Sequence, residues 1–403
     1  MYSDYPDPFN KMAPLDGITV VTIEQAVAAP FATRQLADLG ARVIKIERPQ
    51  TGDFARAYDQ TVRGMASSFV WLNRSKESLT LDVKHPRSSE ILNRLMERAD
   101  VFVQNLAPGA AARLGLSADA LLERHPRLIV CDISGYGDTG PYRDKKAYDL
   151  LIQGESGLMS ITGTPEAPAK AGNSIADISA GMYAYSGILV ALFQRERTGK
   201  GARVEISMFE ALCEWMMFPL YYANCGGIPF RRSGPYHAAI FPYGPFHTND
   251  GRTVMIGIQN EREWKVFCER VLNCPEITAD PRFDSNSQRV ANRDSLGSIL
   301  DMFFSRLKME ELVELLDATG IANSQMNNLE DVWKHPQLAF RKRWRTVDSP
   351  VGPIPALLPP GMPSGVEPRF DPIPALGEHV DSILTELGYS RPQIDLLRSE
   401  KVV

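Results

Sequence analysis

The chain has 403 residues, of which 44% are hydrophobic and 23% charged, and its formal net charge at pH 7 is −5. This length predicts two domains, or one large domain with a smaller insertion. The dispersed basic residues argue against nucleic acid as the main partner. The five cysteines contain no CxxC pair, which argues against a disulfide framework or a zinc site and fits a reducing cytoplasm.

The N-terminal segment MYSDYPDPFNKMAPLDG lacks the basic-then-apolar order of a signal peptide. No stretch approaches the roughly 18 uninterrupted apolar residues of a membrane span. The longest candidate, around 178–194, contains Ser179, Ser186 and Gln194, and predicts a buried core helix instead. We therefore expect a soluble, cytoplasmic protein without a membrane partner.

The first half of the chain alternates between strand-like and helical segments. Residues 18–24 predict a strand, 30–40 a helix that ends at Gly40, and 41–47 a second strand. The same alternation continues in strands at 78–84, 100–105 and 127–137 and in helices at 86–99 and 116–126. Strands that alternate with helices predict a doubly wound, mostly parallel α/β sheet.

The pattern changes after a helix at 178–197 and a strand at 202–208. Residues 222–247 are rich in Gly, Pro, Tyr and Arg, which predicts a linker or loop. A shorter α+β region follows, with a strand at 252–259, a helix at 261–272 and two helices within 292–320. Residues 351–368 are proline-rich and predict extended chain.

The first strand–helix–strand unit ends in Glu47, where a dinucleotide-binding fold places its ribose-binding acid. Its turn, QAVAAP, contains no glycine, so it does not provide for close approach of the backbone to a pyrophosphate. We expect a Rossmann-like fold that does not bind NAD.

Asp177 precedes a long apolar run that ends in basic residues and Gly199. One interpretation is a helix N-cap, because aspartate suits the positive end of a helix. The other is a nucleophile, because a carboxylate with a reference pKa near ~3.9 is ionised at neutral pH and needs no general base. The chain has no G-x-S-x-G and no HExxH motif, which favours the nucleophile only modestly.

Five separated segments stand out along the chain, in this order: LDGITVVTIEQAVAAPFATRQLADLGARVIKIERPQTGDFAR, NRSKESLTLDVKHP, ISGYGDTGPY, ADISAGMYAYSGILVALFQRERTGKGARVEISMFEAL and ALGEHVDSILTELG. Together they resemble the family III CoA-transferases, which include formyl-CoA transferase and carnitine CoA-transferase. The resemblance implies two ring-like chains interlocked as a homodimer, each with a large Rossmann-like domain and a smaller inserted α+β domain. The expected division is 1–221 for the N-terminal part of the large CoA-binding domain, 222–335 for linker and small domain, and 336–403 for the return linker and C-terminal part.

The resemblance also implies the chemistry. The nucleophilic aspartate of the family falls on Asp177, which forms an acyl-aspartyl anhydride and then an aspartyl-CoA thioester. Coenzyme A is then a substrate, and no tightly bound cofactor or metal is expected. A helix N-terminus would also offer N–H groups to developing negative charge.

Other family positions carry over to coenzyme A contacts. The turn residues Val27 and Ala28 match pantetheine neighbours, and Arg48 matches a contact near the adenosine phosphate. Leu81, Asn105 and Leu106 match adenine and pantetheine neighbours. Arg113 and Lys146 match basic contacts, although Lys145 next to Lys146 leaves that assignment open by one residue.

The chain departs from the family at two places. Where the related α-methylacyl-CoA racemases have a catalytic histidine, it has Tyr148, whose phenol is a poor base at pH 7. In place of the glycine-run loop of formyl-CoA transferase it has RRSGPYHAAIFPYGPF (231–246). These departures argue against racemisation and against oxalate or formate as substrates.

If the acceptor acid is a dicarboxylate, its distal carboxylate needs a cationic side chain to bind it. Arg231, Arg232 and His237 are the candidates for its distal carboxylate, and Tyr148 is a further candidate contact. The function predicted is transfer of CoA from succinyl-CoA to a C4–C5 dicarboxylate such as itaconate, mesaconate or citramalate. The alternatives are a racemase-like enzyme and a non-catalytic acyl-CoA-binding protein.

Overall fold

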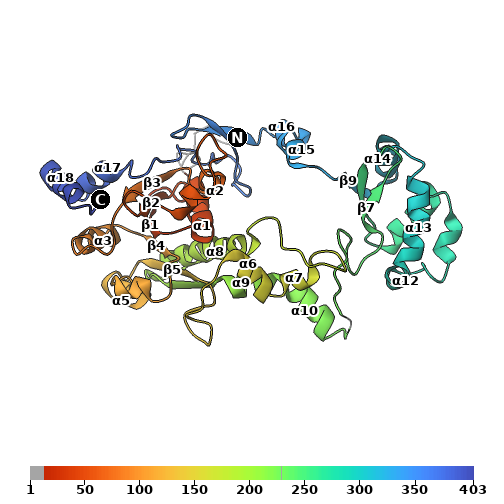
Figure 1. The fold of residues 1–403 in the computed structure, drawn as a ribbon, viewed down its shortest axis with the longest axis horizontal. Helices are drawn as coiled ribbons and strands as arrows, with labels where there is room; N and C mark the ends of the chain where they lie inside the picture. Colours follow the sequence, from red (N-terminus) through yellow and green to blue (C-terminus); the bar gives the residue numbers. More distant parts are fainter. Residues whose placement is uncertain (1–12, 228) are drawn as a thin grey trace, which may run out of the picture. The chain divides into compact units, whose positions relative to one another are not determined.

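The computed structural model describes residues 13–227 and 229–403. Residues 1–12, on which most of the signal-peptide prediction depends, lie outside the described residues. The chain forms two compact units (Figure 1). The first contains the described residues up to Ser156, with Gly172–Met216 and Leu338–Val403, and the second contains Gly157–Ala171 and Met217–Gln337. The predicted domain boundaries at 221/222 and 335/336 stay a prediction.

A six-stranded sheet forms the centre of the first unit, in the order β3-β2-β1-β4-β5-β6. All neighbouring strands are parallel. The strands are β1 (Thr19–Ile23), β2 (Arg42–Glu47), β3 (Lys76–Thr80), β4 (Val101–Gln104), β5 (Ile129–Ser134) and β6 (Arg203–Ser207). The predicted parallel α/β sheet is thereby confirmed. The strand order reverses between β1 and β4, where doubly wound sheets leave a crevice at the carboxyl ends of the strands.

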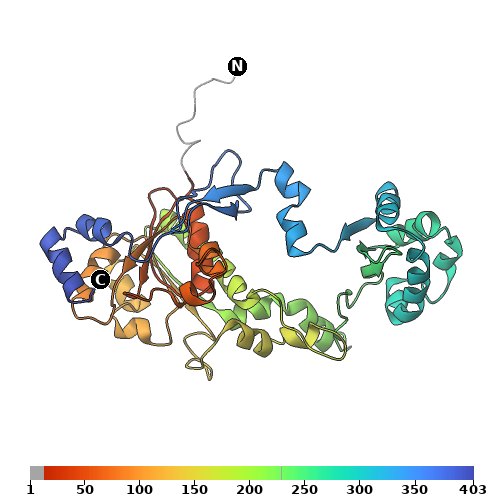
Figure 2. The ribbon, with the colours of Figure 1, turned by 45° about the horizontal axis from the view of Figure 1, so that its top comes forward.

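Helices cover both faces of this sheet. On one face lie α3 (Ser88–Met96), α5 (Ala118–Arg124), α17 (Val380–Glu386) and α18 (Arg391–Ser399), which share one hydrophobic core with β1–β5. The two C-terminal helices, drawn in blue, return beside the orange α3 and α5 (Figure 2). On the other face α1 (Ala28–Asp38) packs on β2 and β4, and α8 (Ile175–Thr198) packs on β5 and β6.

The ALGEH segment fixes the returning C-terminal chain to β3. The backbone N–H of Gly377 donates to Ser78 Oγ at 2.9 Å, and the N–H of Ser78 donates to His379 Nδ1 at 3.2 Å. Asp82 N–H donates to Val402 O at 2.8 Å, so the chain leaves the sheet two residues after β3 ends. The predicted strand at 78–84 is therefore wrong beyond Thr80.

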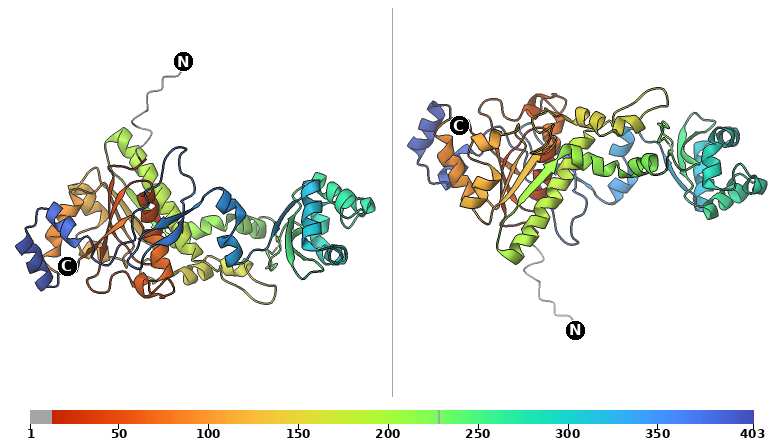
Figure 3. Two further views of the ribbon diagram at one scale, coloured as in Figure 1. Left: turned by 90° about the horizontal axis from the view of Figure 1, so that it is seen from above. Right: turned by 90° about the horizontal axis from the view of Figure 1, so that it is seen from below.

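The long helix α8 confirms the predicted helix at 178–197 and begins three residues earlier. It ends at Gly199, whose φ of 73° suits a left-handed C-cap. By length and apolar content alone α8 could cross a membrane, a test that the core helix of a soluble protein also passes. In the structure it packs on the sheet and on α1, seen as the long yellow-green helix in Figure 3.

A glycine lets α8 approach the start of α1 closely. A Cβ at Gly181 would lie 2.7 Å from Ala28 O and 2.9 Å from Phe31 Cδ1. We expect Gly181→Ala to lower the free energy of unfolding by about 1–3 kcal/mol, because overpacking forces the two helices apart. Thermal unfolding would measure this. The matched control is Gly154→Ala, a helical glycine whose Cβ meets no atom within 4 Å, and it should leave stability unchanged or slightly higher.

Several short elements of the first unit were not predicted. They are the 3-10 helix η2 (Phe54–Ala57), the helices α2 (Ser67–Leu72), α4 (Ala110–Arg113), α6 (Asp149–Glu155) and α9 (Met208–Trp215), and the antiparallel hairpin β10 (Trp344–Val347) and β11 (Ile354–Leu357). Most span two turns or fewer, too few residues for a hydrophobic period to show. The predicted extended chain at 351–368 contains β11.

The second unit contains an antiparallel sheet of β7 (Tyr243–His247), β8 (Thr253–Gly257) and β9 (Ala322–Gln325). The prediction of a loop across 222–247 is wrong at both ends, because 222–224 belongs to a helix and 243–247 pairs with β8. Helices pack around a core that includes Trp264, Phe267 and Phe304. The remaining elements are α7 (Leu158–Ile161), α10 (Met217–Asn224), α11 (Glu261–Val266), η3 (Phe267–Val271), η4 (Pro275–Ala279), α12 (Asn286–Ala291), α13 (Arg293–Phe304), α14 (Met309–Thr319) and α15 (Leu329–Trp333), with α16 (Pro336–Phe340) at the boundary.

Candidate active site

Asp177 is the third residue of α8 and does not cap it. The N-cap position is Ser174, whose side chain makes no capping bond. The capping carboxylate comes instead from Asp149, the first residue of α6, whose Oδ1 accepts from the N–H groups of Ala176 (2.8 Å) and Asp177 (3.3 Å). The interpretation of Asp177 as the N-cap is therefore wrong, and these two N–H groups are already occupied.

The carboxyl of Asp177 is partly buried and lies close to that of Asp149. Burial, and then the charge of Asp149, raises the pKa of Asp177 from its usual range to about 7. The expectation of a fully ionised carboxylate at neutral pH is thereby corrected, because near pH 7 protonated and ionised forms coexist. The ionised form is correspondingly more basic, which suits a nucleophile.

Tyr58 belongs to the same region, although the sequence did not single it out. It follows η2, its side chain is 53% exposed, and burial and then the charges of Asp53 and Asp177 raise its pKa to about 12. Its phenol therefore stays protonated and lies within electrostatic reach of Asp177. Tyr148, next to Asp149, is also exposed. No local pattern distinguishes Tyr58, because only the path of the η2 segment brings it there.

The turn between β1 and α1 is held from two sides. The side chain of Asn105, after β4, accepts from the N–H of Gln25 and donates to its carbonyl, both at 2.9 Å. Asp53 Oδ1 accepts from the N–H of Ala26 at 3.0 Å. These bonds fix the turn at the point where the strand order of the sheet reverses.

The predicted coenzyme A residues near the sheet lie at one edge of it, because parallel strands end on the same side. Val27 and Ala28 follow β1, Arg48 follows β2, Leu81 follows β3, and Asn105 and Leu106 follow β4. Val27, Ala28 and Leu81 are buried, so they shape this edge from beneath its surface. Leu106 packs partly against the core.

Three of the predicted basic contacts are exposed. Among the described residues, no carboxylate lies within ion-pair distance of Arg48, Arg113 or Lys146. Lys145 differs, because it pairs with Glu155 at 2.9 Å and lies over the ring of Tyr142. Lys146 is therefore the better of the two lysines for an external phosphate.

Glu47, the acid at the position of a ribose contact, is buried and bonded to neighbouring side chains. It pairs with Arg56 at 2.7 Å and accepts from Ser78 Oγ at 2.7 Å. Although burial alone would raise the pKa of Glu47, the bond from Arg56 and the charge of Lys45 hold it at about 2. This carboxylate is bonded within the fold and is therefore not available to a ligand.

The acceptor candidates Arg231, Arg232 and His237 lie in the second unit. A pocket of about 1450 Å³ within this unit is lined by both arginines. Arg232 donates to Thr164 O (2.8 Å) and Pro165 O (2.9 Å), so it holds a loop. Arg231 is exposed and has no such bond to the described residues.

His237 is less suited to reading a carboxylate. Its Nδ1 accepts from Ala239 N–H at 3.1 Å, and its ring stacks on Tyr243. Burial, and then the charge of Arg293, lowers the pKa of His237 below its usual value. The ring is therefore neutral at pH 7, and Arg231 is the candidate with an uncommitted positive charge.

Comparisons with known proteins connect this arrangement to one family. The model of CoA-transferase family III matches residues 15–380. The mouse succinyl-CoA:glutarate CoA-transferase is 34% identical, over 98% of this chain and 91% of the relative. The succinyl-CoA:mesaconate CoA-transferase of Haloarcula hispanica is 31% identical, over 94% and 97%.

Solved structures agree with these sequences. A CaiB/BaiF family protein from Brucella suis aligns with a TM-score of 0.80 at 34% identity, over 94% of this chain and all of that one. Rv3272 from Mycobacterium tuberculosis aligns with a TM-score of 0.81 at 28% identity, over 92% and 99%.

Proposed function

The chain belongs to CoA-transferase family III, and on this basis we propose that it moves CoA from succinyl-CoA to a C4–C5 dicarboxylate. The observation that carries the proposal is the set of relatives at 30–34% identity, which are named as succinyl-CoA transferases for glutarate, malate, mesaconate and citramalate. Itaconate, mesaconate and citramalate are the acceptors we favour. All have the second carboxylate that an exposed arginine would bind.

We propose Asp177 as the nucleophile. Its carboxylate attacks the thioester carbonyl, the C–S bond breaks, and an acyl-aspartyl anhydride and CoA thiolate result. The thiolate then attacks the aspartyl carbonyl, which releases succinate and leaves an aspartyl-CoA thioester. The acceptor carboxylate reverses both steps and leaves as the new acyl-CoA, which regenerates the carboxylate of Asp177. The negative charge that moves in each step passes between a carboxylate and a thiolate, so no general base is needed.

The proposed coenzyme A site runs along the carboxyl edge of the sheet. Val27, Ala28, Leu81, Asn105 and Leu106 would form the border of the pantetheine and adenine site. Arg48, Arg113 and Lys146 would bind the phosphates, which suit exposed cations. The side chain of Asn105 already bonds to Gln25, so its part is to shape this edge.

For the acceptor, Arg231 is the proposed contact of the distal carboxylate. Arg232 and His237 are weaker candidates, because one holds a loop and the other is neutral. The exposed phenol of Tyr148 could donate to the carboxylate that enters near Asp177.

We further propose a cytoplasmic, interlocked homodimer with a large Rossmann-like domain and a smaller inserted α+β domain. The exposed apolar side chains of α8 support an interface, since Val190 is 65% and Phe193 is 67% exposed. Sedimentation analysis should give twice the chain mass of 44.8 kDa. A single-chain mass would refute the dimer.

The function is tested by incubating the protein with succinyl-CoA and each acid in turn, with products separated by chromatography and identified by mass. We expect a new acyl-CoA and free succinate in equal amounts for at least one C4–C5 dicarboxylate. Release of succinate and CoA without a new thioester would contradict transfer. Exchange of deuterium into a 2-methylacyl-CoA without an acceptor would favour the racemase.

The proposed nucleophile predicts a particular pH dependence. Because only the ionised Asp177 attacks, kcat/KM for succinyl-CoA should rise about tenfold per pH unit below pH 7 and level off above it. Asp149→Asn removes the like charge that helps to raise the pKa of Asp177, so the rising limb of this pH profile should move to lower pH. The pKa of Asp177 should still stay above its ordinary value, because burial, the larger cause of the shift, remains.

The control for this experiment is Asp119→Asn, which changes an exposed acid in the first turn of α5. Its pH profile should coincide with that of the wild type. If Asp149→Asn also leaves the limb in place, another group controls the rate.

A further inference from the structure

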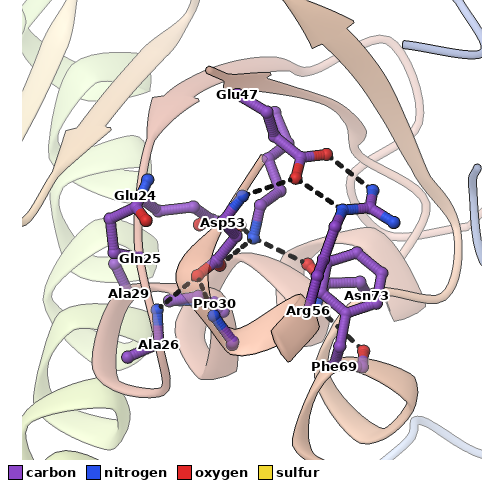
Figure 4. Close-up of polar contacts among 12 residues, drawn as sticks. Glu24, Gln25, Ala26, Ala29, Pro30, Glu47, Asp53, Arg56, Phe69 and Asn73 are labelled. Atoms are coloured by element: carbon purple, nitrogen blue, oxygen red, sulfur yellow. Dashed lines mark hydrogen bonds and ion pairs between the residues drawn. The ribbon is translucent and has the colours of Figure 1, made fainter. Parts of the chain in front are cut away.

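Asp53 lies fully buried where the ends of β1 and β2 meet, and its carboxylate is bonded on every side (Figure 4). Its Oδ1 accepts from the N–H groups of Ala26 (3.0 Å) and Ala55 (2.9 Å). Its Oδ2 accepts from Lys45 Nζ at 2.7 Å. Its own N–H donates to Glu47 Oε2 at 3.0 Å.

The surrounding ionic cluster is balanced in charge. The three acids are Glu24, Glu47 and Asp53, and the three bases are Lys45, Arg56 and Lys76. Five of these residues are buried and Arg56 is partly buried. Burying charges is costly, and apolar side chains of similar volume often stabilise a core at least as well. Retaining such a cluster beside a turn is therefore explained better by the geometry that it imposes than by stability.

The bonds of Asp53 constrain two segments, the β1–α1 turn and η2. Ala26 has a φ of 62°, a left-handed conformation that a residue with a Cβ adopts at some cost. The bond from its N–H to Asp53 holds the turn in this conformation. The same carboxylate caps η2, the short helix that leads directly to Tyr58.

We propose that Asp53 is a positioning residue for the CoA thioester. It holds the β1–α1 turn, with Val27 and Ala28, and the segment before Tyr58 in the conformation that binds coenzyme A. The inference rests on the proposed function, since that function places coenzyme A at this turn. When the binding conformation is only partly populated, the apparent affinity falls by the same fraction. Loss of Asp53 should therefore weaken binding without touching the ligand.

The test is titration calorimetry of coenzyme A itself with the purified protein, which needs no turnover. Asp53→Ala should raise the Kd for coenzyme A at least about tenfold, with KM for succinyl-CoA rising more than kcat falls. The matched control is Asp38→Ala, which removes another buried, doubly paired carboxylate of the first unit. Asp38 pairs with Arg34 and Arg74 and makes no bond to the turn. The Kd of the Asp38→Ala variant for coenzyme A should therefore stay within twofold of the wild-type value.

A second variant guards against loss of folding. Asp53→Ala with Lys45→Met removes one charge of each sign, so the cluster stays balanced while the N–H of Ala26 still loses its acceptor. The folded double variant should also bind coenzyme A at least tenfold more weakly. A Kd within twofold of the wild type in either folded variant would overturn the positioning role. Absence of binding by the wild-type protein would instead overturn the proposed function.

Discussion

Asp177→Ala should lower the rate of CoA transfer by at least about 10⁴-fold. Removing a nucleophile eliminates the covalent route altogether, and losses of this order or greater follow such changes in other enzymes. The wild-type protein, incubated with succinyl-CoA and trapped with hydroxylamine, should carry a modification on the peptide that contains Asp177. The variant should carry none, while its Kd for coenzyme A stays near that of the wild type.

Stability should move in the opposite direction to activity. The folded-state pKa of Asp177, about 7, lies above its ordinary value of ~3.9. Between these two values the folded chain binds more protons than the unfolded chain, so this group lowers stability as the pH rises. At pH 8 Asp177→Ala should therefore unfold at a higher temperature than the wild type.

CoA transfer by Asp177→Ala at a rate within tenfold of the wild type would show that a different residue is the nucleophile.

Arg231→Ala should lower kcat/KM for the dicarboxylate acceptor about 10- to 100-fold. A hydrogen bond between charged groups contributes about 1.5–3 kcal/mol, and each 1.4 kcal/mol is a factor of ten. The loss should lie mainly in KM for the acceptor, with KM for succinyl-CoA also raised because succinate is itself a dicarboxylate. Transfer from acetyl-CoA to a monocarboxylate should be unaffected, because neither acyl group has a distal carboxylate.

Two comparisons make this assignment specific. Arg262→Ala removes an exposed arginine of α11 that does not line the pocket, and it should leave every kinetic constant unchanged. Arg232→Ala should lower stability, because it releases the carbonyls of Thr164 and Pro165. If Arg231→Ala leaves the acceptor KM untouched while Arg232→Ala raises it, the two roles are exchanged.

The helix that carries Asp177 shows how far local pattern reaches. Its apolar run, basic C-terminal turn and Gly199 predicted α8 correctly, because helix periodicity and capping act within a few residues. The same pattern suggested that Asp177 caps the helix. The real cap, Asp149, lies 28 residues away along the chain, so no local pattern could reveal it.

The charge states of buried side chains could not be predicted from local pattern either. A reference pKa predicted an ionised Asp177 at neutral pH, but burial and the approach of Asp149 raise the pKa to about 7. Lys45, within the predicted strand at 41–47, is fully buried and pairs with Glu24 and Asp53. Desolvation and pairing depend on which distant segments meet, and only folding decides that.

The sequence by itself determined the alternating strands and helices, the parallel sheet, the family and the acid proposed as nucleophile. Each rests on short-range periodicity or on motifs whose order along the chain is informative. The tertiary structure decided the order β3-β2-β1-β4-β5-β6, the cap from Asp149, the nearness of Tyr58 and the hold of Asp53 on the β1–α1 turn. These features arise from pairs of residues far apart in sequence, whose contacts depend on the packing of the whole unit.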